Sequence, residues 1–325
     1  MIKTYFFNHA EDAIFHDVDL SEKDVLLADP KNLLWIDLYD CSEKELTYMG
    51  EVFDFHPLAL EDCLQESPRA KVDWYDDGYH FFVFHSLRYF EEAEDDEITS
   101  IELDVFLGAN YVVTIHPTAL SAVGKVARIC LGGSELMNRG PDYMLYSIVD
   151  NLVDDYFPII ERLGERIDEL EDEIYINPAH EITEEIMALK RTIILLRKVI
   201  LPQRRIFANV NGRYSFVISE DNKPYYLDLV EHLDRIIDAS DTYRDLVNSS
   251  METYYSIVSN RTNEIVRVLT IISTIMMPLT FITGLYGMNV HIPGHNNPNY
   301  FWFIATGCSL LVTTMLTVFH RKRWV

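Results

Sequence analysis

Two long apolar runs near the C-terminus dominate the hydrophobic pattern of the chain. Residues 300–319 carry no charge over 20 positions, and residues 265–286 carry one, Arg267. A helix needs about 20 predominantly apolar residues to cross a bilayer, and Pro278 and Gly284 are tolerated in such a helix. The pattern predicts two transmembrane helices. The alternative, a buried hairpin of a soluble protein, fits poorly because both runs are long and flank a short polar loop.

The segment before the first apolar run predicts one exceptionally long helix. Residues 225–277 contain neither Gly nor Pro over 53 positions. A continuous helix of that length would extend about 80 Å at 1.5 Å per residue, and its last part would be the first membrane span. Because a helix this long does not pack alone, we expect a bundle formed by several copies of the chain.

The N-terminal part alternates β-rich and helical patterns, which favours a mixed α/β domain. The acidic run 91–97 falls between two β-rich segments and is interpreted as a solvated hairpin loop. The predicted strands cover residues 33–38, 79–89, 98–107 and 111–116, and the predicted helices cover 42–53, 57–64 and 118–130.

From residue 141 to 211 the pattern is helical almost throughout. The dipeptide Asn177-Pro178 breaks it, and Gly212 is expected to end it, so the sequence predicts an antiparallel helix pair. The predicted fold is an α+β cytoplasmic domain of αβα type, followed by a very long helix and two C-terminal transmembrane helices. Its expected parts are the α/β domain 1–140, helix pair 141–212, stalk 213–264, first span 265–288, outer loop 289–299, second span 300–319 and basic tail 320–325.

Charge is distributed very unevenly along the chain. Residues 1–264 hold all 52 acidic residues and all but four of the 27 basic ones, the exceptions being Arg267, Arg321, Lys322 and Arg323. So acidic a body repels nucleic acid and concentrates cations around it. The four cysteines are widely spaced without a CxxC pair, and the N-terminus has no apolar secretory run, so we expect free thiols in a reducing compartment.

The basic residues Arg321–Arg323 predict the orientation in an inner or plasma membrane. Basic residues next to a span favour the cytoplasmic side, which places the C-terminus there. Two spans then place residues 1–264 in the cytoplasm as well, and leave only about a dozen residues outside.

One stripe of the long helix is a candidate pore lining. Its members recur at steps of three and four, so they share one helix face; they are Thr262, Val266, Leu269, Ser273, Met277 and Thr280. The pattern alone equally fits an ordinary helix–helix seam. If identical helices surround an axis, one stripe must face that axis, and this uncharged stripe would suit a hydrated ion, because Mg²⁺ gives up water reluctantly. Apolar rings at Leu269 and Met277 could gate by dewetting.

The chain resembles the CorA family of divalent-cation channels over essentially its whole length. The resemblance rests on the segment 277–282 (MPLTFI), on Tyr286-Gly287-Met288-Asn289 at the end of the first span, and on the blocks 56–62 (HPLALED) and 142–146 (DYMLY). It implies a homopentameric funnel that transports Mg²⁺, Co²⁺ and Ni²⁺. In such a funnel the motif 286–289 would form the outer mouth, where Asn289 would offer oxygen atoms to a hydrated ion.

The same resemblance implies regulation by intracellular Mg²⁺. By motif position, Asp62 and Asp228 would form an inter-subunit pair that binds the ion, with Glu61 beside them. Clustered carboxylates repel one another without a cation, and an oxygen-liganded Mg²⁺ relieves this repulsion. Without the family, Asp62 alone reads as an ordinary carboxylate on a helix surface. Apart from Mg²⁺ as substrate and regulatory ligand, we expect no cofactor.

The outer loop departs from the family pattern. Many members carry Met-Pro-Glu-Leu there, whereas residues 290–299 contain no acid and two histidines, His291 and His295. Imidazole suits Zn²⁺, Ni²⁺ or Co²⁺ better than Mg²⁺, although both side chains could simply face water. Relatives that transport zinc usually carry Ile at the position of Met288, so this residue favours Mg²⁺.

Three functions therefore remain open at the level of sequence. The first is a passive, Mg²⁺-gated channel for Mg²⁺, Co²⁺ and Ni²⁺, and the second is a proton-coupled Zn²⁺ or Ni²⁺ transporter on the same scaffold. The third is a membrane-anchored scaffold without flux. An enzyme is not expected, because the sequence has no Gly-rich phosphate loop, nucleophile elbow or HExxH motif.

Overall fold

A computed structural model describes residues 1–75, 78–89, 98–176, 181–208, 218–288, 299–322 and 324. The chain forms two compact units. Unit 1 comprises Met1–Glu173 and Ala179–Ser250, and unit 2 comprises Ile174–Pro178 and Met251–Val325.

Unit 1 is built on a seven-stranded sheet with the order β2-β1-β3-β7-β6-β5-β4. Neighbouring strands pair antiparallel except β3 and β7, which run parallel in the middle of the sheet. The strands are β1 (Ile2–Asn8), β2 (Ala13–His16), β3 (Leu33–Tyr39), β4 (Lys71–Tyr75), β5 (Tyr79–Tyr89), β6 (Ile98–Leu107) and β7 (Tyr111–His116).

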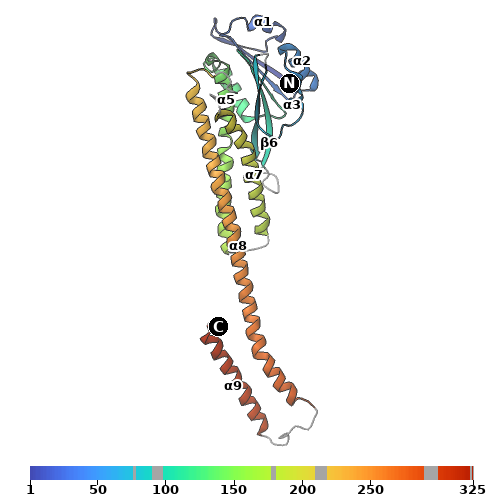
Figure 1. Ribbon diagram of the computed structural model, residues 1–325, viewed down its shortest axis with the longest axis vertical. Helices are drawn as coiled ribbons and strands as arrows, with labels where there is room; N and C mark the ends of the chain where they lie inside the picture. The colour runs from blue at the N-terminus through green and yellow to red at the C-terminus, as the bar shows by residue number, and fades with distance from the viewer. Residues whose placement is uncertain are drawn as a thin grey trace. The chain divides into compact units, whose positions relative to one another are not determined.

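Helices cover both faces of this sheet (Figure 1). On one face, α2 (Glu43–Phe53) and α3 (Pro57–Leu64) bury an aromatic core in which the rings of Phe55 and Phe106 stack 3.9 Å apart. The short helices η1 (Leu20–Glu22) and α1 (Lys23–Leu26) precede β3. On the other face lie α4 (Ser121–Gly132), η2 (Met137–Arg139) and α5 (Pro141–Asp154). This arrangement confirms the predicted αβα layering.

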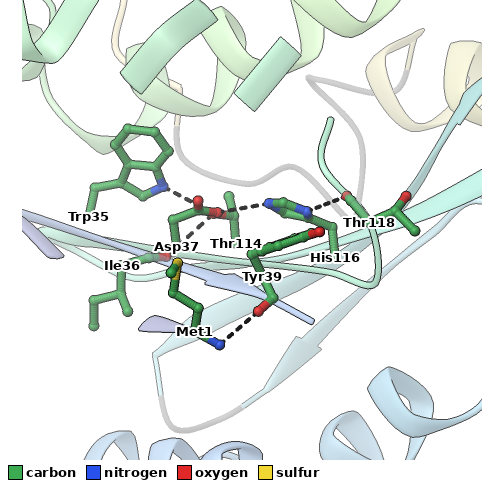
Figure 2. A network of polar contacts seen from close by, with 8 residues as sticks. All are labelled: Met1, Trp35, Ile36, Asp37, Tyr39, Thr114, His116 and Thr118. Atoms are coloured by element: carbon green, nitrogen blue, oxygen red, sulfur yellow. Dashed lines mark hydrogen bonds and ion pairs between the residues drawn. The ribbon is translucent and has the colours of Figure 1, made fainter. Parts of the chain in front are cut away.

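A buried polar network joins the two parallel strands at the centre of the sheet (Figure 2). The Asp37 carboxylate of β3 lies 3.0 Å from His116 Nε2 of β7 and accepts a 2.7 Å hydrogen bond from the Thr114 hydroxyl. His116 Nδ1 donates to the carbonyl of Thr118, because a carbonyl can only accept. Trp35 Nε1 donates to the Thr114 hydroxyl. Each polar group in this network therefore has a partner, as burial requires.

Among the described residues of 141–208 there are three helices where the sequence predicts a pair: α5, which ends at Asp154, α6 (Phe157–Ile176) and α7 (Glu181–Ala208). The first part of α8 (Lys223–Tyr286) completes unit 1. The extra break follows from Pro158, which has no N–H to donate to the carbonyl of residue 154. The Tyr156 hydroxyl also anchors this point by donating to the carbonyl of His85.

Most of the predicted strands and helices of unit 1 are confirmed. The sequence reasoning missed β1, β2 and β4, which are short or lie toward the sheet edges. The predicted hairpin loop 91–97, the break at 177–178 and the helix end at Gly212 lie outside the described residues.

Unit 2 contains the rest of α8 and the helix α9 (Tyr300–Arg321). Helix α8 is continuous over 64 residues, which confirms the predicted long helix. Both helices are long and apolar enough to cross a membrane. Arg267, the one charged residue of the first apolar run, lies 4.0 Å from Glu264 one turn earlier.

Candidate cation pathway and regulatory carboxylates

The faces of α8 in unit 2 are distinguished by the neighbouring helix α9. The least exposed positions of α8 recur at helical spacing: Ile271 is buried, and Ile275, Pro278, Leu279 and Ile282 are partly buried. On α9 the partly buried positions follow the same rhythm, at Ile304, Cys308, Leu311, Met315 and Phe319. We infer that these two apolar stripes form a seam between α8 and α9, because both helices belong to unit 2 and run next to each other in Figure 1.

The predicted pore stripe lies on the opposite side of α8. At 3.6 residues per turn, its mean direction is roughly 170° from the seam that contacts α9. All six members are exposed in the single chain, and Met277 and Leu269 are 72% and 63% exposed. The α9 contact therefore leaves this stripe, which runs from Thr262 to Thr280, free to face other copies of the chain.

Helix α8 ends at the sequence motif that marks the proposed outer mouth. The last helical residue is Tyr286, and Gly287 N–H still donates a 2.8 Å hydrogen bond to the carbonyl of Thr283. Met288 is 58% exposed. Asn289, His291 and His295 lie outside the described residues.

The first regulatory candidates lie on α3, whose start is fixed by its local sequence. Pro57 occupies the first turn, and the His56 imidazole accepts a hydrogen bond from the N–H of Leu58. This register places Glu61 on the outer side of α3, opposite Ala59, which is fully buried, and Asp62 at the partly buried edge one turn after Ala59. Glu61 is exposed and accepts a hydrogen bond from the Gln65 amide.

Asp62 has a cationic partner within the chain. Lys71 Nζ lies 2.6 Å from Asp62 and 2.9 Å from Asp73. Partial burial lowers the pKa of Lys71, but these two carboxylates outweigh that effect and raise it overall. The Asp62 side chain remains 34% exposed, so a cation that arrives from outside the chain can compete with Lys71 for it.

The second regulatory candidate, Asp228, belongs to a row of ionisable groups between α8 and α5. His232 lies one turn after Asp228 on α8, with 3.7 Å between His232 Nε2 and Asp228 Oδ2. On its other side, His232 Nδ1 is 4.0 Å from Asp150 Oδ1 of α5. Both of these facing atoms are buried and lack a hydrogen-bond partner among the described residues. Burial and the nearby Asp154 raise the pKa of Asp150.

Asp150 and His232 are the site residues that the sequence reasoning missed. The spacing of Asp228 and His232, four residues apart on one helix face, was an available signal, whereas Asp150 joins them only through the packing of α5 against α8. The structure places Asp62 and Asp228 in different clusters of unit 1. Within the described part of one chain, no three His, Cys, Asp or Glu side chains are arranged to hold a metal ion.

Known proteins resemble this chain over most of its length. It is 33% identical to the cobalt/magnesium transport protein CorA of Thermotoga maritima, covering 90% of this chain and 83% of that protein. It is 27% identical to the protein of the same name from Methanocaldococcus jannaschii, covering 90% and 92% of the two chains.

Solved structures share the fold. The complete structure of the CorA magnesium transporter from Methanocaldococcus jannaschii superposes with a TM-score of 0.85, covering 100% of this chain and 99% of that one at 24% identity. Full-length CmaX gives a TM-score of 0.79 at 22% identity over 99% and 97% of the two chains. The family described as CorA-like Mg²⁺ transporter protein matches residues 30–321. With two helices able to span a bilayer, the chain is a membrane protein that belongs to the CorA-like Mg²⁺ transporter family.

Proposed function

We propose that this protein is a channel for divalent cations, with Mg²⁺, Co²⁺ and Ni²⁺ as substrates. The observation that carries the proposal is the uncharged stripe of α8, which lies opposite the α9 seam on a helix that ends at the Tyr286–Asn289 motif. Family membership and the cobalt and magnesium transport named for its relatives support the same function.

The pore would be formed by a homopentamer in which five copies of α8 surround one axis. In each copy the stripe Thr262–Thr280 would face the axis, while α9 would lie outside and face lipid. A wall of hydroxyl groups and apolar side chains offers no charged ligand, so the ion would pass with its water shell, which Mg²⁺ releases reluctantly. Asn289 would contact that shell at the outer mouth.

The membrane potential would drive the flux inward. With the basic residues Arg321 and Lys322 in the cytoplasm, both termini and the acidic body lie on the inner side. Moving one charge through 100 mV is worth about 2.3 kcal/mol, so a divalent ion gains about twice that. No coupled proton is then required, in contrast to a proton-coupled Zn²⁺ or Ni²⁺ transporter on the same scaffold.

Intracellular Mg²⁺ would close the channel by bridging neighbouring subunits. Glu61 and Asp62 of α3 would supply one carboxylate set, and Asp228 of the next subunit would supply the other. Asp150 and His232 would extend the second set, because their facing atoms are buried and have no hydrogen-bond partner in the part of the chain that the structure describes. A bound cation would separate Asp62 from Lys71 and neutralise the carboxylates that otherwise repel one another.

Substitution of these carboxylates tests the regulation. We expect Asp62→Ala and Asp228→Ala to weaken Mg²⁺-dependent closure, because each removes a ligand of the bridging ion. Protection from limited proteolysis should then require roughly tenfold more Mg²⁺, corresponding to about 1.4 kcal/mol. Asp238→Ala, an exposed residue on the same helix, is the matched control. Wild-type Mg²⁺ protection in both carboxylate variants would refute the assignment.

Metal flux into vesicles tests the channel itself. The purified chain should carry Mg²⁺ when a potential is applied, and Asn289→Ala should abolish uptake while the protein remains assembled. A membrane-anchored scaffold predicts no flux in either protein.

A further inference from the structure

A basic pocket lies between the edge strand β4 and the helix α7 of unit 1. Its volume is about 690 Å³, which lies within the usual range for small-molecule sites. Four cationic side chains line it: Arg69, which precedes β4, and Arg197, Lys198 and Arg205 of α7. So many cations in one pocket are unusual in a chain with a formal net charge of −25.

Most of this positive charge is not neutralised within the chain. Arg197 pairs with Asp241 of α8, and the one acid in the wall, Asp73, is paired with Lys71 at 2.9 Å. Within the described residues, Arg69, Lys198 and Arg205 form no ion pair, and all three are exposed. The pocket therefore presents three available cations, and forked guanidinium groups suit phosphate oxygens.

The α7 wall has a regular construction. Its lining residues recur at positions i, i+4 and i+8, so one helix face carries cations at both ends and Leu201 and Pro202 between them. A proline inside a helix costs about 3 kcal/mol and removes one backbone hydrogen bond. Here it leaves the carbonyl of Lys198, in the same wall, without its helical donor.

The opposite wall contains Asp73 and two apolar side chains, which offer a surface to an organic group. These apolar residues are Ala70 and Val72. Trp74, two residues further along β4, shares the face of Val72 and is 65% exposed. An exposed indole beside a basic pocket is the arrangement on which a nucleobase stacks while its phosphates meet the cations.

We propose that this pocket binds a nucleoside polyphosphate. The cations of Arg69, Lys198 and Arg205 would hold the phosphates, and the apolar side chains of the strand wall, together with Trp74, would hold the base. Because the contacts come from side chains, no Gly-rich phosphate loop is required.

Isothermal titration of the full-length protein in detergent with metal-free ADP tests this site. We expect ADP to bind, and the double variant Arg69→Ala with Arg205→Ala to weaken the binding at least tenfold. Arg191→Ala, an exposed residue of α7 outside the pocket, is the control and should bind like wild type. Equal ADP affinity in the double variant and the wild type, or no ADP binding to the wild type, would overturn the proposal.

Two further measurements separate a nucleotide from phosphate alone. Pyrophosphate should bind more weakly than ADP, because it lacks the base; equally tight binding of pyrophosphate would overturn the nucleotide assignment. ADP should also quench tryptophan fluorescence in the wild type and not in Trp74→Phe. Persistence of the quench in that variant would remove Trp74 from the site. Neither result depends on cation flux, so the site can fail while the proposed channel stands.

Discussion

At the residue scale, the Asp37–His116 pair shows how a buried polar group holds the centre of the sheet. Asp37 and His116 are only 7% and 4% exposed. They link side chains of β3 and β7, the one parallel pair among the described strands. Burying such a pair yields little net stability, but removing one partner leaves the other uncompensated.

We therefore expect Asp37→Ala to destabilise unit 1 by about 3–5 kcal/mol. The variant leaves His116 Nε2 without its partner and leaves the Thr114 hydroxyl only the longer contact to the carbonyl of Ile36, at 3.4 Å. Thermal unfolding of the purified protein should show a clearly lower melting temperature, whereas the exposed control Asp24→Ala should melt like wild type. An unchanged melting temperature for Asp37→Ala would show that the network adds nothing.

Glu102 of β6 gives the fold a pH dependence. Burial, together with the nearby Glu66 and Asp62, raises the pKa of Glu102 to about 7, although the N–H of Ser67 donates a 2.6 Å hydrogen bond to its carboxylate. Burial and Glu102 raise the pKa of the adjacent Asp104 well above its ordinary value.

The sign of this effect follows from proton linkage. Between about pH 4.3 and 7, Glu102 keeps its proton in the folded state but has lost it in the unfolded chain. The folded state therefore binds more protons, and the free energy of unfolding falls as the pH rises through this range. We expect a lower melting temperature at pH 8 than at pH 5.5, and a smaller difference in Glu102→Gln. The exposed control Glu43→Gln should keep the full difference. The same difference in Glu102→Gln would contradict the assignment.

At the element scale, the two sides of α8 differ in exposure. The seam with α9 uses apolar side chains, and the opposite stripe contains the exposed Leu269 and Met277. If these side chains form dewetting rings in the closed channel, making one of them polar should let water and ions leak through.

Leu269→Ser is therefore expected to raise Mg²⁺ leak at high internal Mg²⁺ several-fold. Val268→Ser is the matched control, because its side chain is also exposed but points about 100° away around the helix. Flux into vesicles preloaded with Mg²⁺ measures the leak. An equal increase in both variants would argue against a pore on this face of α8.

An element could be predicted from the sequence where neighbouring residues alone determine it, and could not where contacts with distant residues hold it in place. The long helix α8 could be predicted because no Gly or Pro interrupts residues 225–277. The edge strand β4 has five residues and is held by its pairing with β5, so its sequence alone carried too little pattern. The helix break before Tyr156 depends partly on a hydrogen bond to His85, far away in the sequence.

The same distinction separates the parts of the candidate site. The stripe on α8 follows from helical periodicity, so its shared face could be predicted, but its position opposite α9 required the packing of two helices. Asp228 and His232 share one helix, whereas Asp150 reaches them from α5. The basic pocket could not be predicted at all, because β4 and α7 are more than 100 residues apart in sequence.

At the scale of the whole molecule, one chain holds only part of each proposed site. Asp62 and Asp228 lie in separate clusters, and the α8 stripe of one chain is fully exposed. Both features are accounted for by an assembly of identical copies, in which the stripe meets its equivalents and the two carboxylate sets meet across subunits. The proposed pentamer would therefore be a condition for both conduction and regulation.

The most direct test of the central claim is metal flux into vesicles that contain the purified protein. An inside-negative potential without a pH gradient should drive Mg²⁺ uptake, with Co²⁺ and Ni²⁺ also carried, and Asn289→Ala should abolish uptake while Asn297→Ala retains it. Metal uptake that requires a pH gradient and does not respond to the potential would contradict a passive channel and favour the proton-coupled alternative.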